Sequence, residues 1–98
     1  MIVHVALFQW KPGVTQEQVS SALEDVRALK SKVPGLHDIL CGANYSKWND
    51  GLTHAVVVLA ETQEALDAYR RHPDHVVVGK LIDGMEHRGI GVDFDSDN

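Results

Sequence analysis

Six of the 98 residues are histidines, a share well above average usage. His4 and His54 fall inside strongly apolar segments and His75 follows a helix break, so we expect all three to be buried. Imidazole exchanges protons near neutrality because its unperturbed pKa is about 6.5. If these rings converge with the phenol of Tyr69, they suit general acid–base catalysis. The alternative for each ring is a structural role, because buried polar side chains usually find hydrogen-bond partners.

A metal site is a competing interpretation of the histidines. His72 and His75 are three residues apart, a spacing that could bring two imidazoles together on one helical turn. However, Pro73 lies between them, and structural zinc normally takes four ligands including cysteine, whereas Cys41 has no companion thiol. Three acidic residues alternate near the C-terminus without the oxygen-rich loop of a calcium site: Asp93, Asp95 and Asp97. We predict no dedicated metal.

Nucleophilic catalysis and cofactor binding find little support in the sequence. Cys41 lies in a predicted strand, where a cysteine is more often a small buried hydrophobe than a thiolate, and Ser46 is not in a nucleophile elbow. The glycines are scattered and form no phosphate-binding loop. A flavin or nicotinamide domain would also need a longer chain. We therefore predict no cofactor.

Composition and charge exclude several classes of protein. Hydrophobic residues make up 44% of the chain and charged residues 23%, as in ordinary soluble proteins, and residues 1–98 are predicted to form a single domain. The net charge of −5 and the lack of a basic cluster argue against nucleic-acid binding. No apolar run approaches the roughly 20 residues that span a bilayer, and no signal peptide is evident, so we predict a cytoplasmic protein with no membrane partner.

The first half of the chain predicts a strand, a helix and a second strand. Residues 2–9 are rich in β-branched and aromatic side chains, and both faces of this strand are largely apolar. Thr15 and Gln18 match a capping box, and apolar residues then recur at helical spacing, which predicts a helix over residues 16–33. A proline–glycine pair ends this helix, and residues 36–43 are predicted to form a strand.

The second half continues after a polar loop at residues 44–52. Residues 53–60 are again apolar on both faces, which predicts a third strand. Thr62 can cap a helix that the His72-Pro73 pair interrupts. A short helix is expected after the proline, although the three valines that follow could also form a strand. A last strand is predicted over residues 88–94.

The element order β-α-β-β-α-β is that of an α+β, ferredoxin-like protomer with a four-stranded antiparallel sheet. In this layout both helices cover one face of the sheet and leave the other bare. Two strands are apolar on both faces, and no residues remain to build a cover for the bare face. We therefore predict a homodimer in which a second sheet packs on it.

Three large aromatic side chains could line an apolar pocket: Phe8, Trp10 and Trp48. Aromatic residues at such places more often belong to the core or to a subunit interface, so we expect these three to pack there. His37 and His87 lie near predicted strand ends and are expected at the surface.

Five segments together resemble the Dabb family, the stress-responsive dimeric A/B-barrel domain, over nearly the whole chain. The most specific is Tyr-x-x-His-Pro-x-His at residues 69–75. The others are His4-Val5, Val33-Pro34-Gly35, Gly42-Ala43-Asn44 and Gly51-Leu52-Thr53-His54. The resemblance implies a ferredoxin-like protomer whose sheet pairs face to face with that of a second copy in a dimeric α+β barrel. It does not assign a substrate, because members of one fold family differ in function.

The resemblance also implies roles for individual residues, carried over from a plant polyketide cyclase that performs an intramolecular aldol condensation without a cofactor. Its paired Tyr and His match Tyr69 and His75, and its two strand histidines match His4 and His54. His75 would be the general base, and Tyr69 would donate a hydrogen bond to the developing oxyanion. His4 and His54 would bind the substrate, a small carbonyl or aromatic compound. Phe8 is a further candidate for substrate binding as a possible pocket-lining aromatic and not by the resemblance, because the cyclase's hydrophobic pocket residues are not obviously matched here. The alternative is a non-catalytic stress-responsive or small-ligand-binding dimer.

Overall fold

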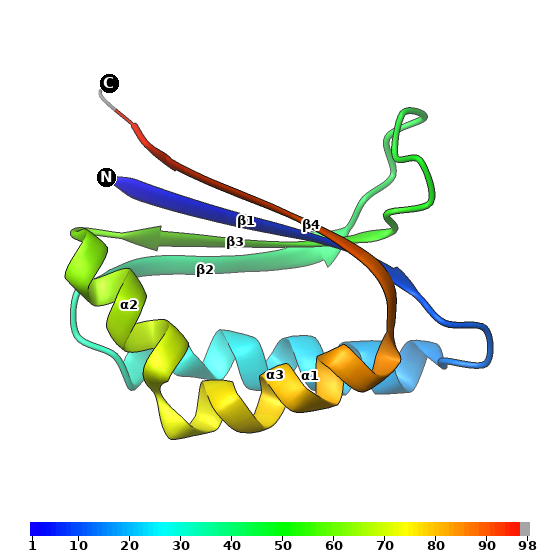
Figure 1. The fold of residues 1–98 in the computed structure, drawn as a ribbon, viewed down its shortest axis with the longest axis horizontal. Coiled ribbons are helices and arrows are strands. Elements are labelled where there is room, and N and C mark those ends of the chain that lie inside the picture. Colours follow the sequence, from blue (N-terminus) through cyan, green and yellow to red (C-terminus); the bar gives the residue numbers. More distant parts are fainter. Residues whose placement is uncertain (97–98) are drawn as a thin grey trace.

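The computed structural model describes residues 1–96, and its elements follow the predicted order, with the second helical segment divided in two (Figure 1). The strands are β1 (Ile2–Trp10), β2 (Leu36–Ala43), β3 (His54–Ala60) and β4 (Glu86–Asp95). The helices are α1 (Gln16–Ala28), α2 (Gln63–Arg71) and α3 (Pro73–Met85). All strand pairs are antiparallel, in the sheet order β2-β3-β1-β4. The predicted ferredoxin-like fold is confirmed.

The first helix begins where the sequence predicts and ends earlier. The Thr15 hydroxyl accepts a hydrogen bond from the Gln18 amide at 3.1 Å, and the Gln18 side chain accepts one from the Thr15 amide at 2.8 Å, so the capping box is complete. Regular α-helix stops at Ala28 and continues as one 3₁₀ turn to Ser31, whereas the prediction extended the helix to residue 33. The following proline disfavours helical geometry before it, and helices often tighten into a 3₁₀ turn at their ends.

Two helices meet at the His72-Pro73 step. His72 ends α2 and also caps α3, because its Nδ1 accepts a hydrogen bond from the Asp74 amide at 3.1 Å. α3 has 13 residues, so the prediction of a short helix was an underestimate and the strand alternative for the valines was wrong. The buried residues of α3 explain the helix, because they recur at helical spacing: Val78, Ile82 and Met85.

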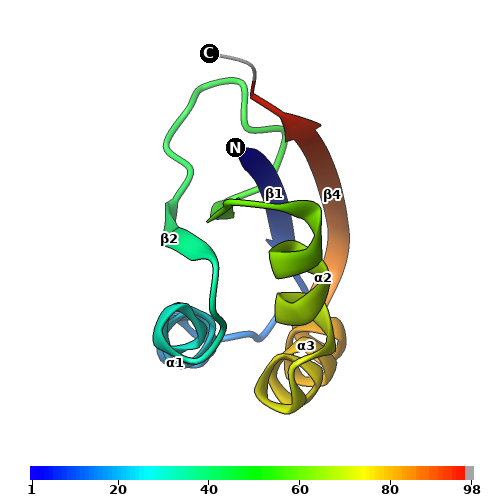
Figure 2. The same ribbon diagram turned by 90° about the vertical axis from the view of Figure 1, so that its left-hand side faces the viewer.

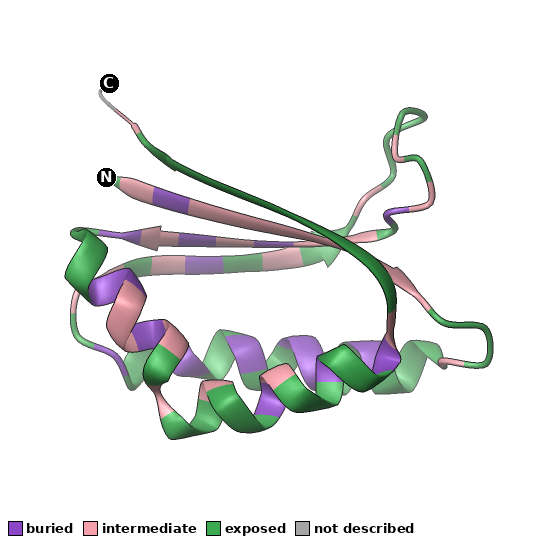
Figure 3. Ribbon diagram, in the orientation of Figure 1, coloured by how far each residue is buried: buried purple, intermediate pink, exposed green. Residues whose placement is uncertain are grey.

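The helices cover only one face of the sheet (Figures 1 and 2). Buried positions gather between the sheet and the helices, while β4 is exposed along most of its length (Figure 3). The opposite side, which we call the open face, carries apolar side chains from all four strands. One row across it, set by the strand register, is Leu40, Val57, Val5 and Val92. Leu40 and Val92 in this row are exposed, as is Phe94 beside it.

The aromatic residues that were expected to pack behave in two ways. Phe8 and Trp10 pack against the core and stack on one another, with ring centroids 5.1 Å apart. Trp48 lies in the loop between β2 and β3 and is 81% exposed. It therefore does not pack in the core of the protomer, which was one of the two places expected for it. His37 and His87 are exposed, as expected.

The last strand starts two residues earlier and ends one residue later than predicted, since β4 spans Glu86–Asp95. Of the three aspartates considered as calcium ligands, two lie in β4 and Asp97 lies outside the described residues. None of the helices described for residues 1–96 is long and apolar enough to cross a membrane.

Two glycines with a left-handed backbone offer a matched test of packing. Gly13 and Gly35 have φ angles of +89° and +85°. A Cβ at Gly13 would meet nothing within 4 Å, whereas one at Gly35 would lie 2.8 Å from the Cβ of Ala65 in α2. We expect Gly13→Ala to lower the free energy of unfolding by about 1–2 kcal/mol, the cost of the left-handed backbone. Gly35→Ala should lower it by at least about 1 kcal/mol more because of overpacking. Urea denaturation measures both, and equal losses would contradict the packing of α2 on this turn.

Candidate active site

A cavity of about 160 Å³ lies between the sheet and the helices. Its lining comes from β1 (His4, Ala6, Phe8), β3 (Val56), α1 (Val26), α2 (Tyr69) and α3 (His75, Val78, Gly79, Ile82, Asp83). Four of the five residues singled out from the sequence therefore face one space: His4, Phe8, Tyr69 and His75. Most of the wall is apolar, as in small-molecule sites where a few polar groups set the orientation of the ligand.

The break between α2 and α3 sets Tyr69 against His75. Tyr69 lies near the end of α2 and His75 in the first turn of α3, and the chain changes direction between them (Figure 1). Their ring centroids are 4.6 Å apart, with an interplanar angle of 65°. This edge-to-face contact is a preferred arrangement of aromatic rings, so it helps to orient both side chains at the cavity wall.

Tyr69 is 3% exposed, and burial is the main reason that its pKa is raised to about 12. The phenol is therefore neutral at physiological pH and can donate a hydrogen bond. Within residues 1–96, every side-chain oxygen or nitrogen that is fully buried has a hydrogen-bond partner. The Tyr69 hydroxyl has no such partner there, so it is not fully buried. The hydroxyl is thus not sealed inside the protein, and the cavity that Tyr69 lines is the space open to it.

His75 is partly buried, and its pKa is lowered, first by burial and then by electrostatic interaction with His4 and Arg70. The lowered pKa keeps the imidazole neutral at pH 7, the form that can accept a proton. Tyr69 and His75 therefore place a neutral hydrogen-bond donor beside a neutral proton acceptor.

His4 is held by an acidic and a basic side chain, with its ring centroid 6.4 Å from that of Tyr69. The Nδ1 of His4 lies 2.5 Å from one carboxylate oxygen of Asp93, and the other oxygen accepts a hydrogen bond from Arg70 at 2.6 Å. These hydrogen bonds, that of Arg70 first, lower the pKa of Asp93, so the carboxylate is ionised and accepts. An ionised carboxylate can only accept, so the Nδ1 of His4 carries a proton toward Asp93, although the Nη2 of Arg70 also lies 3.2 Å from this nitrogen. The Nε2 of His4 is the ring nitrogen left to meet a ligand.

Asp93 and Arg70 were not identified from the sequence. They join His4 because the β1–β4 register places Asp93 directly opposite it, and because Arg70 follows Tyr69 on α2. Strand register depends on the whole sheet and not on local sequence. The alternating aspartates near the C-terminus were the available signal, but they were interpreted only as a weak calcium pattern.

The structure does not bring His54 to this cavity, although it was a candidate for substrate binding. In the β1–β3 register His54 lies opposite Phe8 and His4 lies opposite Val58, so the two histidines are about 13 Å apart along the sheet. The Nδ1 of His54 accepts a hydrogen bond from the indole N–H of Trp10 at 2.9 Å, and burial lowers its pKa. His54 lines a separate hollow beside α1.

Two residues considered for other chemistry have local surroundings that explain them. The Nδ1 of His72 is engaged in capping α3. Cys41 is partly buried, and burial raises the pKa of its thiol. A neutral thiol is a poor nucleophile, which agrees with the interpretation of Cys41 as a small hydrophobe.

The class of this protein follows from its architecture: an α+β protomer with helices on one face of a four-stranded antiparallel sheet and a cavity between the two layers. The family model described as "Stress responsive A/B Barrel Domain", or Dabb, matches residues 2–96, and the chain belongs to this family. The resemblance noted from the sequence is thereby confirmed.

One named relative and two solved structures show how similar the chain is to known proteins. Olivetolic acid cyclase from Cannabis sativa is 28% identical over 82 residues, which cover 82% of this chain and 81% of the cyclase. A dimeric ferredoxin-like protein of unknown function from Thermobifida fusca is 29% identical, with a TM-score of 0.85 and coverage of 97% of this chain and 90% of that one. Hydroxynitrile lyase from Passiflora edulis has a TM-score of 0.87 at 15% identity, covering 99% of this chain and 94% of the lyase, which shows a shared fold alone.

The lowered pKa of His75 predicts how stability depends on pH. In the unfolded chain the imidazole takes up a proton near pH 6.5, whereas in the folded protein it does so only at lower pH. The unfolded state binds more protons in this window, so the free energy of unfolding falls as the pH drops from about 7 to about 5.5. Asp93 does not contribute there, because its lowered pKa affects stability only in more acidic solution.

His75→Gln should make this fall shallower, and His54, whose pKa is also lowered, should account for part of what remains. Guanidinium denaturation at a series of pH values measures the slope. A slope that is the same in wild type and His75→Gln would contradict a neutral, buried His75.

Proposed function

We propose that the chain forms a cytoplasmic homodimer whose cavity binds a small carbonyl or aromatic compound and performs cofactor-free acid–base chemistry on it, of the aldol-cyclase or isomerase type. One observation carries the proposal: a neutral buried phenol and a neutral imidazole meet in an otherwise largely apolar cavity. General acid–base catalysis requires such a donor and acceptor within reach of one substrate.

In the proposed reaction, His75 removes a proton from the carbon next to a carbonyl group. The electrons of that C–H bond move into the carbonyl, and the Tyr69 hydroxyl donates a hydrogen bond to the enolate oxygen. In a cyclase, the enolate carbon attacks a second carbonyl of the same molecule, and protonated His75 gives its proton to the new alkoxide. In an isomerase, the proton returns to a different carbon. No step is an oxidation or a reduction, so none requires a redox cofactor.

His4 and Phe8 would bind the substrate in this scheme. Because Asp93 fixes the proton of His4 on Nδ1, its Nε2 can accept a hydrogen bond from a substrate hydroxyl. Phe8, two pleats along the same face of β1, supplies an aromatic wall. The cavity of about 160 Å³ favours a compact ligand, since sites for drug-sized molecules enclose about 300–1,000 Å³.

The similarity to olivetolic acid cyclase supports this class of reaction, because it extends over most of both chains. The resemblance noted from the sequence implies that Tyr69 and His75, in the Tyr-x-x-His-Pro-x-His segment, match the paired Tyr and His of the cyclase. A shared fold does not fix a substrate, so the proposal names a class of compound and not the cyclase's own substrate.

The main support for the proposed homodimer is the apolar open face. Exposed apolar side chains on the edge strands β2 and β4 flank part-buried valines of β1 and β3, and soluble monomers rarely leave a large apolar surface uncovered. The similar Thermobifida fusca protein is described as dimeric. A second copy packed sheet to sheet would cover both open faces at once.

A non-catalytic ligand-binding dimer is the second candidate. It is favoured by the hydrogen-bonded chain of Arg70, Asp93 and His4, which could serve only to order the cavity wall. In that case a ligand would bind beside Tyr69 without any exchange of protons.

Proton abstraction can be measured without knowing the later steps of the reaction. We expect the protein to accelerate the exchange of deuterium from D₂O into the carbon next to the carbonyl of a compact aryl ketone or β-keto thioester, followed by NMR. His75→Gln should lower the enzymatic rate by about 10²–10⁴-fold, the usual contribution of a general base. Tyr69→Phe should lower it by about 10²–10³-fold, the usual contribution of an oxyanion donor.

His54→Gln is the matched control, because it removes an imidazole of lowered pKa that lies outside the cavity, and it should leave the rate unchanged. If deuterium exchange is no faster with the wild type than with His75→Gln, the proposal that His75 catalyses proton abstraction is contradicted. Binding of the ketone without exchange would favour the second candidate.

A further inference from the structure

We propose that the loop between β2 and β3, residues 44–53, is an arm that grips a second copy of this chain through Tyr45 and Trp48. The inference rests on the homodimer of the proposed function and adds the segment by which each subunit holds the other. It concerns a part of the molecule away from the cavity, so it does not depend on catalysis.

The position of the arm is the first argument. In both ribbon views it rises on the side of the sheet away from the helices (Figures 1 and 2). A hollow of about 480 Å³ lies where the arm meets the open face, lined by Leu7 and Ala55 of the sheet and by Asn44, Tyr45 and Ser46 of the arm. The surface that a second copy would cover therefore continues from the sheet onto the arm.

The exposure of the arm's aromatic side chains is the second argument. Tyr45 is 98% exposed and Trp48 is 81% exposed. Tyrosine and tryptophan are among the residues that most often carry the binding energy of an interface. The ammonium group of Lys47 lies 5.1 Å from the centroid of the Trp48 ring, so one face of the ring has a neighbour and the other can meet a partner.

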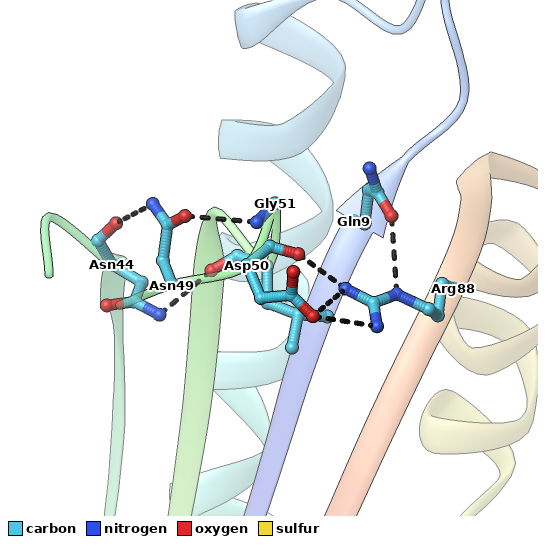
Figure 4. Close-up of polar contacts among 7 residues, drawn as sticks. Gln9, Asn44, Asn49, Asp50, Gly51 and Arg88 are labelled. Carbon is cyan, nitrogen blue, oxygen red and sulfur yellow. Dashed lines mark hydrogen bonds and ion pairs between the residues drawn. The ribbon is translucent and has the colours of Figure 1, made fainter. Parts of the chain in front are cut away.

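Hydrogen bonds within the arm brace its backbone (Figure 4). The Asn44 side chain donates to the carbonyl of Leu52 at 2.9 Å. The Asn49 side chain donates to the carbonyl of Asn44 at 3.3 Å and accepts from the Gly51 amide at 3.0 Å. An ordered loop that presents aromatic rings is preorganised for binding, because little conformational freedom remains to be lost when the partner arrives.

Arg88 ties the arm to the far edge of the sheet. Its guanidinium donates to the carboxylate of Asp50 at 3.2 Å, to the backbone carbonyl of the same residue, and to the Gln9 side chain at 3.4 Å (Figure 4). Gln9 belongs to β1 and Arg88 to β4, so the arm that joins β2 to β3 is anchored to the other two strands as well. Hydrogen bonds therefore join the arm to the sheet that carries the open face.

The area that a stable dimer needs is the third argument. The open face measures about 26 Å along its strands and about 19 Å across them, a flat footprint of about 500 Å². Standard interfaces bury about 800 Å² on each partner. A tyrosine and a tryptophan bury about 150–250 Å² each, so the two side chains of the arm would add substantially to the surface that a second copy covers. A second copy is the partner that fits, because twofold symmetry sets both open faces and both arms against each other.

The test uses the full chain. A Trp10→Phe background leaves Trp48 as the single tryptophan, and acrylamide quenching then reports its exposure. Sedimentation equilibrium supplies the dissociation constant of the dimer. We expect the emission of Trp48 to shift to shorter wavelength, and its quenching to fall, as the protein concentration passes through that constant.

Tyr45→Ala combined with Trp48→Ala should raise the dissociation constant by about 30-fold or more, the factor that corresponds to the loss of one interface hot spot. Val77→Ala is the matched control, because Val77 is 70% exposed but lies on α3, on the helical side, and it should leave the constant unchanged. If the double substitution leaves the dissociation constant unchanged, and Trp48 in the dimer is quenched as fully as in the monomer, the proposed role of the arm is contradicted. The homodimer itself would not be contradicted by that result. A wild-type chain that stays monomeric at every concentration would overturn both.

Discussion

A sheet that is apolar on both faces must be covered on both, and most of this structure follows from that requirement. The chain supplies helices for one face only (Figure 2). On that side the helical layer is broken at His72-Pro73, and the residues that flank the break, Tyr69 and His75, line the cavity. On the other side the apolar surface remains exposed, and the arm between β2 and β3 extends it. The candidate site and the proposed interface therefore lie on opposite faces of the same four strands.

The cavity combines two electrostatic environments. In its wall, burial keeps both members of the central pair neutral, because it raises the pKa of the Tyr69 phenol and lowers that of the His75 imidazole. At its edge, Asp93 and Arg70 form an ion pair that remains partly exposed to solvent. Exposed ion pairs add little to stability, so we infer that this pair matters more for fixing the proton of His4 on Nδ1 than for holding the fold.

Features that depend on residues close together in the sequence could be predicted from it. The capping box at Thr15, the helix break at His72-Pro73 and the order of helices and strands along the chain are of this kind. The proximity of Tyr69 to His75, six residues apart, is another. The length of α3 was underestimated because its run of valines also suits a strand.

Features that depend on strand register could not be predicted in this way. The contact between His4 and Asp93 joins residues 89 positions apart, and it follows from the pairing of β1 with β4. His54 was grouped with His4 because both lie on apolar strands, but sequence does not reveal how far along the sheet two such residues are from each other. Trp48 was expected in the core or at a subunit interface, and its exposure on the protomer rules out only the core.

Binding of a small carbonyl or aromatic compound beside Tyr69 and His75 can be tested by an NMR titration of the histidine ring protons with acetylacetone and with phenol. A ligand in the cavity should shift the signals of His4 and His75 and leave those of His54 in place, since His54 lies about 13 Å along the sheet from His4. Tyr69→Phe should weaken the binding. Shifts at His54 without shifts at His75, or no shift at any histidine with either compound, would contradict the site.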